Sequence, residues 1–191
     1  MAHQTLKFRI IGEVPLLMHN GQLADPLNKW SKAMKAVSGK RKKTDSDHEE
    51  MARLQWYGSL YLLDGKPCLP GEVIEATFIN AAKKSKLGTQ AKMGVFCPGN
   101  YFLHYDDEHD TVDELWDGNN HRHTCMGVIN RNRVPITRPM FTGWSADCEI
   151  VYDDEVLNER EMWSILETAG RYIGMCDWRP RYGRFTVSKI E

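Results

Sequence analysis

Apolar and polar residues alternate in two segments, as they do in a strand that buries one face. The first runs from Thr5 to Pro15 and ends in the turn-forming residues Gly12 and Pro15. The second runs from Trp144 to Tyr152. Further strands are expected in "RFTVSKI" near the C-terminus, in "VFCPGNYFLHYDD" with an interruption at Pro-Gly, and in one or two short pieces of "CMGVINRNRVPITRPMF".

Three other segments have helical periodicity and recognisable ends. Asp47 with Glu50 predicts a capping box for a helix that runs to about Trp56. A second helix should start at Pro70 and bury a stripe with a spacing of four residues, made of Ile74, Phe78 and Ala82. A third should follow Asn158, with Glu161 completing its capping box and Gly170 ending it. Residues 88–94 are expected to form a polar connection.

This order of elements predicts the α+β class, with a ferredoxin-like, RNA-recognition-type antiparallel sheet covered by helices. We expect one domain over residues 1–191, a usual domain length. Residues 27–46 should be a basic, flexible insertion that follows the first strand.

Composition excludes several classes of protein. Hydrophobic residues make up 41% of the 191 positions, so the chain can bury a core without disulfides. No apolar run reaches the ~18 residues of a membrane span, and we expect neither a membrane partner nor a secretory leader. The five cysteines are scattered without a CxxC pair, which indicates reduced thiols in a cytoplasmic protein.

The net charge of −1 conceals an asymmetry between the two halves. Residues 1–100 carry 15 Lys and Arg against 9 Asp and Glu, whereas residues 101–191 carry 10 against 17. Chance and a solvated acidic face would explain this, and so would subunits that meet basic side to acidic side. The densest basic segment, residues 29–43, ends in Lys40, Arg41, Lys42 and Lys43, which form either a solvated loop or a phosphate-binding arm.

The C-terminal stretch "GRYIGMCDWRPRYGRF" combines glycine, arginine and aromatic residues. Glycine permits close approach to a phosphate, arginine binds it in a bidentate manner, and aromatic rings stack on unpaired bases. The alternative is structural, with Trp178 buried in the core and Arg179 and Arg181 paired with the acidic residues 106–117. The candidate nucleic-acid-binding residues here are Arg171, Tyr172, Trp178, Arg179, Arg181, Tyr182 and Arg184, and "NRNRVPITRP" adds Arg131, Arg133 and Arg138.

Candidates for a metal site or for catalysis are few. His121, His123 and Cys125 alternate along the chain and would need a fourth ligand from Cys97, His104 or His109 to hold zinc. A polar loop is the alternative, and we expect no cofactor. His19 would be a general base for RNA cleavage, but no acid follows at a defined spacing. We therefore expect a protein that is not an enzyme.

The "PLLMHN" exit from the first strand, the helix entry "LPGEVIEATFINAAKK" and the C-terminal "GRYIGMCDWRPRYGRF" together resemble the RAMP superfamily, RNA-binding proteins of CRISPR effector complexes. The likeness is greatest to the backbone-subunit type. In that family an LPGS-like turn starts a helix, and a glycine-rich loop follows the last helix of a ferredoxin-like fold. This chain is shorter than such subunits, and its loop has fewer glycines.

The leading hypothesis is a non-catalytic protein that binds single-stranded nucleic acid, RNA first, and self-assembles or docks on a ribonucleoprotein complex. The partners would be single-stranded RNA or DNA together with copies of the same chain or subunits of a larger particle. Three alternatives stay open. They are a phage single-stranded-DNA-binding or annealing protein, a RAMP-like endoribonuclease, and a mimic of a backbone subunit that inhibits a CRISPR complex.

Overall fold

A computed structural model of the chain describes residues 3–107, 111–129 and 131–190. The chain forms two compact units. The first unit contains residues 1–16, 62–108 and 141–191, and the second contains residues 17–61 and 109–140. The expectation of a single domain stays a prediction. No helix in the described ranges is both long and apolar enough to cross a membrane.

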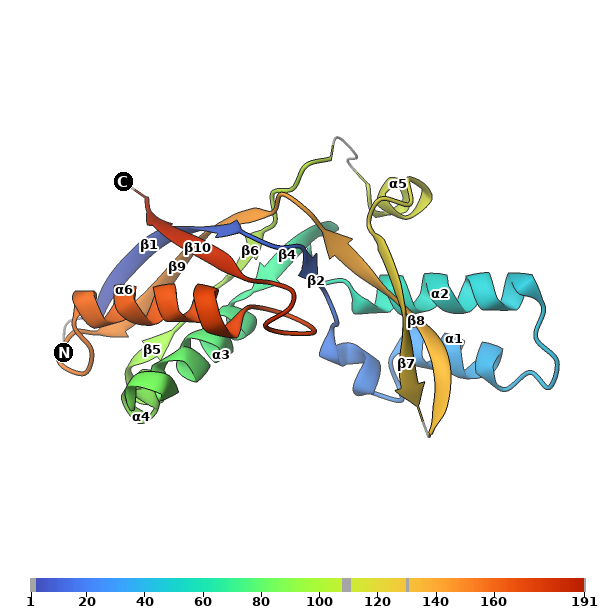
Figure 1. The fold of residues 1–191 in the computed structure, drawn as a ribbon, viewed down its shortest axis with the longest axis horizontal. Coiled ribbons are helices and arrows are strands. Elements are labelled where there is room, and N and C mark those ends of the chain that lie inside the picture. Colours follow the sequence, from blue (N-terminus) through green and yellow to red (C-terminus); the bar gives the residue numbers. More distant parts are fainter. Residues whose placement is uncertain (1–2, 108–110, 130, 191) are drawn as a thin grey trace. The chain divides into compact units, whose positions relative to one another are not determined.

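The first unit is built on a four-stranded antiparallel sheet with the order β10-β1-β9-β5 (Figure 1). Helix α3 lies between β1 and β5 in sequence, and helix α6 lies between β9 and β10. The sequence of elements is therefore βαββαβ with strand order 4-1-3-2, and it confirms the predicted ferredoxin-like class. The strands are β1 (His3–Gly12), β5 (Val95–Phe96), β9 (Ser145–Asp153) and β10 (Phe185–Lys189).

Helices α3 (Gly71–Ala82) and α6 (Glu159–Thr168) cover one face of this sheet (Figure 1). The alternation expected in the sequence produces the core, because alternate side chains are buried from Leu6 to Ile10 on β1 and from Ala146 to Tyr152 on β9. The predicted stripe of α3 is also confirmed, since Ile74, Phe78 and Ala82 are at most 2% exposed. The inner face of α6 is buried through Met162, Ile165 and Leu166.

The rest of the first unit extends this core. A small sheet has the order β3-β4-β6, and Pro70 at the end of β4 leads directly into α3. After α3 the chain makes a short 3₁₀ turn, η2, and then helix α4. These elements are β3 (Leu62–Leu63), β4 (Lys66–Pro70), β6 (Asn100–Phe102), η2 (Lys83–Ser85) and α4 (Gly88–Gly94).

The second unit combines a helix pair, a long hairpin and a cluster of aromatic rings. Trp56 is fully buried, and its indole nitrogen donates to the carbonyl oxygen of His121 at 2.8 Å. Trp116 packs edge-on against it. The elements are β2 (Leu16–Leu17), η1 (Gly21–Ala24), α1 (Lys29–Ser38), α2 (Asp45–Ser59), α5 (Val112–Asp117), β7 (Arg122–Ile129) and β8 (Asn132–Phe141).

Three local predictions are wrong. Thr44, rather than Asp47, caps α2, and Asp47 is the third helical residue, which completes the capping box. Residues 88–94 form helix α4 instead of a polar connection. Gly170 does not end the third predicted helix, which continues as a π-helical turn, η3 (Ala169–Ile173). A bulky residue at position 170 is excluded because a Cβ would lie 2.0 Å from the carbonyl oxygen of Phe185.

The cap of α6 leads to a stability prediction. Asn158 accepts a hydrogen bond from the Glu161 amide at 3.0 Å, and the Glu161 carboxylate accepts one from the Asn158 amide. Replacing Asn158 by Ala should cost about 1 kcal/mol of unfolding free energy, because a helix donor loses its partner. Asn158→Asp, which keeps an acceptor, should cost much less. Equal midpoints of urea unfolding for the two variants would contradict this account.

Candidate nucleic-acid interface

The C-terminal loop, residues 174–184, is closed at its base by backbone hydrogen bonds. The Met175 amide donates to the Gly183 carbonyl oxygen at 2.8 Å, and the Gly183 amide donates to the carbonyl oxygen of Pro15 at 2.9 Å. Gly174 has a φ of 74° and Gly183 a φ of 72°, conformations that favour glycine. A Cβ at position 183 would also lie 2.1 Å from the Met175 oxygen. Both glycines are buried and fix the base of the loop.

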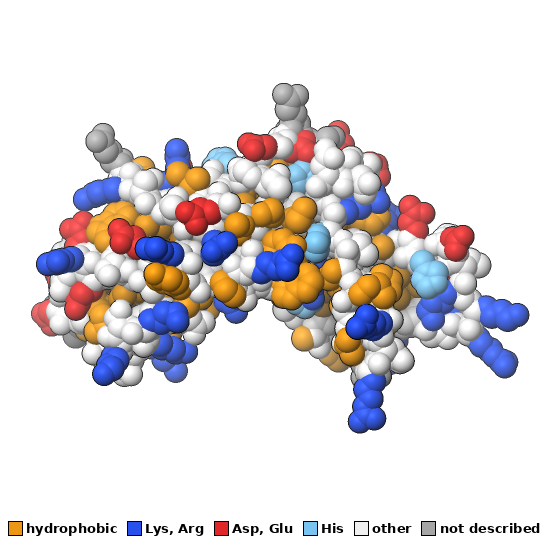
Figure 2. All heavy atoms as spheres, in the orientation of Figure 1, with side chains coloured by type: hydrophobic (Ala, Val, Ile, Leu, Met, Phe, Trp, Pro, Cys, Tyr) orange, Lys and Arg blue, Asp and Glu red, His pale blue; other side chains and the backbone are white. Residues whose placement is uncertain are grey.

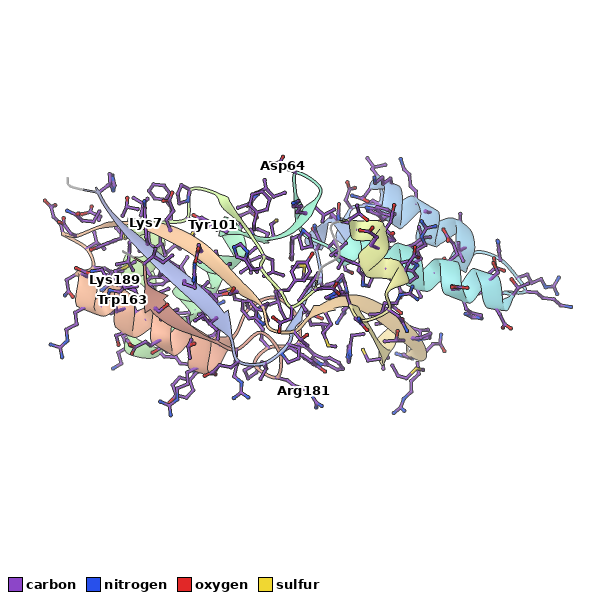
Figure 3. The ribbon with its side chains drawn as sticks, turned by 90° about the horizontal axis from the view of Figure 1, so that it is seen from above. Lys7, Asp64, Tyr101, Trp163, Arg181 and Lys189 are labelled. Carbon is purple, nitrogen blue, oxygen red and sulfur yellow. The ribbon has the colours of Figure 1, made fainter. Side chains whose placement is uncertain are left out.

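The tip of the loop presents a stacked aromatic pair. The rings of Trp178 and Tyr182 are 5.9 Å apart with an interplanar angle of 18°, and the Tyr182 amide donates to the Trp178 carbonyl oxygen. The guanidinium of Arg181 lies 6.0 Å from the centre of the Tyr182 ring. In Figure 3 the Arg181 side chain extends away from the ribbon. Arg179 precedes a cis proline within a turn.

Trp178 does not fill the core, in contrast to the structural alternative. Its side chain is 48% exposed, whereas Trp144 in the same unit is 1% exposed. Arg171, Arg179, Arg181 and Arg184 are exposed as well. Neither Arg179 nor Arg181 forms an ion pair with any residue that the structure describes. The loop therefore offers cations and an aromatic face to a ligand.

Cys176 in the loop is half-buried, and its thiol is shielded from water. Burial raises the pKa of Cys176 to about 12, so the thiol is protonated at neutral pH. The side chain of Met175 beside it is 1% exposed. These two residues attach the loop to the first unit and leave the residues from Trp178 to Tyr182 at its surface.

The open face of the sheet has a different character. Arg9 on β1 makes a bidentate ion pair with Asp147 on β9, at 2.6 and 2.7 Å, and Lys7 lies opposite Glu149 in register. The pKa of Asp147 is lowered by its hydrogen bonds from Arg9.

The outward positions of β1, β9 and β10 carry no Phe, Tyr or Trp, but Phe96 on the edge strand β5 is 46% exposed and contacts His3 edge-on. Bases that stack on a protein need such rings. The loop is the better candidate surface because its stacked pair of rings lies beside Arg179 and Arg181.

The predicted basic arm is a turn between two helices in the second unit. Residues 27–46 contain α1 and the connection to α2, and the flexibility of this insertion stays a prediction. Figure 2 shows Lys and Arg side chains projecting from this tip. Lys40 forms an ion pair with Asp47, and this contact lowers the pKa of Asp47 to about 2. Arg41, Lys42 and Lys43 are exposed, so three of the four predicted cations remain available to a ligand.

The three arginines of "NRNRVPITRP" lie on the β7–β8 hairpin of the second unit. Arg131 has a φ of 67° at the turn, and Arg133 pairs in register with Val128. Both side chains are exposed. Arg138 is half-buried opposite His123 and is less accessible. That these residues bind nucleic acid together with the C-terminal loop stays a prediction, because they belong to the other unit.

The alternating histidines do not form a metal site among the described residues, in which no group of three His, Cys, Asp or Glu side chains is placed to hold an ion. His121 is 3% exposed, and its Nδ1 lies 3.1 Å from the carbonyl oxygen of Met140. His121 is therefore part of the packing of the hairpin. His109, one proposed fourth ligand, lies outside the described residues.

His19 is exposed and follows β2 in the second unit. Its carbonyl oxygen accepts a hydrogen bond from the Tyr61 hydroxyl at 3.0 Å. This contact positions the backbone and gives no evidence of a general base.

Two features of the loop were not foreseen from the sequence. One is the stack of Trp178 on Tyr182. Their separation of four residues is the only sequence feature that could have indicated this contact. The other is the π-helical turn before Gly174, whose amide bonds to the carbonyl oxygen of Ala169 at 2.9 Å. No sequence signal marks that turn, because its geometry depends on the close approach of Gly170 to β10.

Comparisons with known proteins add little. No family model and no curated protein matches the chain. Among solved structures, the crystal structure of Cmr6 from Pyrococcus furiosus aligns over 100% of both chains, with a TM-score of 0.42 and 9% identity. A match at this level supports no inference about function. The ferredoxin-like assignment above rests on the strand order itself.

Substituting two tryptophans in turn tests whether Trp178 is a surface side chain or part of the core. Trp178→Ala should leave the thermal midpoint nearly unchanged, because the ring is half exposed. Trp144→Ala is the matched control and should cost about 3–5 kcal/mol, because it removes a fully buried ring. Calorimetry or thermal circular dichroism measures both. A large loss of stability in Trp178→Ala would show instead that this side chain is packed in the core.

Proposed function

We propose that this protein binds single-stranded nucleic acid, RNA in the first place, without cleaving it. The observation that supports this most directly is the exposed Trp178–Tyr182 stack next to Arg179 and Arg181 on a loop with a fixed base. Stacking of an unpaired base on such a ring contributes about 1–3 kcal/mol, and it tolerates any base. Arginine beside the ring binds the phosphate that follows.

The closed base of the loop favours binding because it limits the entropy lost when the strand docks. Gly183 bonds to the exit of β1, and Met175 bonds across the loop, so the ends of the tip are already positioned. A ligand then orders mainly side chains. On the open sheet face Arg9 is already paired with Asp147, so this cation attracts a polyanion less than the exposed arginines of the loop do.

RNA takes precedence over DNA because the sequence motifs resemble RNA-binding RAMP proteins. The same resemblance supports a role as a self-assembling or docking subunit of a ribonucleoprotein complex. A phage single-stranded-DNA-binding protein and an inhibitory mimic of a backbone subunit would use the same loop chemistry. Binding assays with RNA and DNA of matched sequence, followed by sedimentation, separate these alternatives.

The loop arginines provide the main test. Arg179→Ala combined with Arg181→Ala should weaken binding of a labelled single-stranded RNA at least about tenfold, or 1.4 kcal/mol. Trp178→Ala should produce a loss of similar size, because it removes the stacking surface. Fluorescence anisotropy at fixed salt measures both effects. Arg9→Ala, on the open sheet face, serves as the control and should bind normally. Wild-type affinity in the double arginine variant would exclude the loop.

The basic turn should contribute affinity that does not depend on sequence. Replacing Arg41, Lys42 and Lys43 by Ala should flatten the salt dependence of binding, by about 0.7 in the log–log slope for each lost phosphate contact. The thermal midpoint should not change, since these side chains are exposed. Lys40→Ala should behave differently and weaken the start of α2, because its Asp47 partner belongs to the capping box. An unchanged salt slope in the triple variant would remove the turn from the interface.

Catalysis should be absent. Labelled RNA incubated with wild type or with His19→Ala should remain equally intact, with or without a chelator. Cleavage that grows with time and stops in the His19 variant would instead establish a ribonuclease.

A further inference from the structure

A second basic site lies in the first unit, at the far end of α3 from the entry at Pro70. It is a pocket of about 820 Å³ formed by the last turns of α3, the turn η2 and helix α4. Lys83, Lys86 and Lys92 line it, together with Asn80, Thr89 and Met93. In Figure 2 several Lys and Arg side chains gather over α3 and α4, at the lower left.

The fold of the backbone brings these lysines together. Lys86 adopts a left-handed conformation with a φ of 61°, and the Leu87 amide donates to the carbonyl oxygen of Ala82 at 2.9 Å. The chain thereby reverses and places α4 beside the end of α3. Gly88 allows this close contact, because a Cβ there would lie 2.6 Å from Cγ of Lys83. Lysines nine positions apart in sequence thus line one pocket.

The charges in this pocket are not compensated. None of its lining residues is acidic, and within the described ranges Lys83, Lys86 and Lys92 form no ion pair. Lys83 donates only to the side-chain oxygen of Asn80, at 2.9 Å. Helix dipoles favour cations near C-terminal ends, and Lys92 lies in the last turn of α4, but a partial charge of this kind does not neutralise three lysines around one pocket. Three cations around one pocket repel each other unless an anion is bound.

The pocket also has an apolar part. Met93 is 78% exposed at its rim, and Ile79 and Ala76 contribute to its lining. A flexible, polarisable thioether adapts to flat rings, and the lysine amines and the Thr89 hydroxyl donate to phosphate oxygens. This combination fits a nucleotide unit, with an anionic phosphate and an apolar base, better than a simple inorganic anion.

We infer that the pocket formed by α3, η2 and α4 holds a phosphodiester and base of the same single strand that the C-terminal loop binds. This inference rests on the proposed function. Cys176 of the loop lies close enough to Cys68 for that thiol to raise its pKa, and Cys68 precedes Pro70 at the start of α3. The loop is therefore at one end of α3 and the pocket is at the other. A helix of 12 residues spans about 18 Å, which several nucleotides can bridge.

The test compares short and long RNA strands in two variants of equal charge. Lys86→Gln with Lys92→Gln removes two pocket cations, and Lys7→Gln with Lys66→Gln removes two exposed lysines elsewhere in the first unit. An oligouridine of about 16 nucleotides should bind the pocket variant about tenfold more weakly, with a salt slope reduced by about 1.4. An oligomer of about 4 nucleotides should bind it as it binds wild type. The control variant should bind both normally.

Amine footprinting gives an independent readout on the wild-type protein. Bound 16-mer should protect Lys86 and Lys92 from acylation, measured by mass spectrometry, while Lys66 stays reactive. Unprotected pocket lysines, or equal losses in the two variants, would overturn the pocket while the Arg179 and Arg181 variant still shows the loop to be a binding site. A wild-type protein that binds neither strand would overturn the proposed function and the pocket together.

Discussion

The packing of Trp144 against the exit of β1 is the contact on which both the sheet and the C-terminal loop depend. The indole nitrogen donates to the carbonyl oxygen of Val14, and the Gly12 amide donates to the Trp144 carbonyl oxygen, each at 2.8 Å. A Cβ at Gly12 would lie 2.2 Å from the indole, so only glycine fits there. Phe185 packs edge-on against the same ring. One buried tryptophan thus joins the end of β1, the start of β9 and the start of β10.

The exit of β1 in turn supports the C-terminal loop. The Glu13 amide donates to the carbonyl oxygen of Arg184, and the Pro15 carbonyl oxygen accepts from Gly183. These bonds use backbone groups that a strand end would otherwise leave to water. The loop tip is consequently held by the most buried part of the first unit, while Trp178 remains half exposed. A hydrogen-bonded support under an exposed aromatic and cationic tip is consistent with the proposed stacking of unpaired bases on that tip.

The cations that the structure describes fall into two groups, those paired with an acidic residue and those without such a partner. Cations on the sheet face are neutralised by cross-strand partners, as in the Arg9–Asp147 pair, and Lys40 is neutralised by Asp47. Cations without an ion pair among the described residues include those of the C-terminal loop, the remaining ones at the tip between α1 and α2, Arg131 and Arg133 of the β7–β8 hairpin, and those of the pocket at the end of α3. A net charge near zero therefore coexists with separate basic surfaces, which a polyanion can contact without strong attraction to the rest of the molecule.

The sequence by itself determined what depends on neighbours along the chain. Alternation in β1 and β9, the stripe of α3 and the Asn158 cap of α6 follow from local periodicity and capping chemistry, and the resulting order of elements was enough to predict the ferredoxin-like class. Residues 88–94 were misjudged because glycine at both ends resembles a loop, whereas the burial of Ala91 stabilises a helix there.

Only the tertiary structure decided which polar and aromatic residues remain accessible. The composition of the C-terminal stretch was compatible with a core tryptophan or a stacking surface, and the closure of the loop by Gly183 and Met175 is what leaves Trp178 outside. The sequence does not show which of the neighbouring cations Lys40 and Arg41 is paired, and in the structure Lys40 forms an ion pair with Asp47. Lys83 and Lys92 line one pocket because the chain reverses at Lys86, and no local pattern specifies that reversal. Which side chains pair and which stay accessible depends on where the folded backbone places them, and local sequence patterns do not specify that placement.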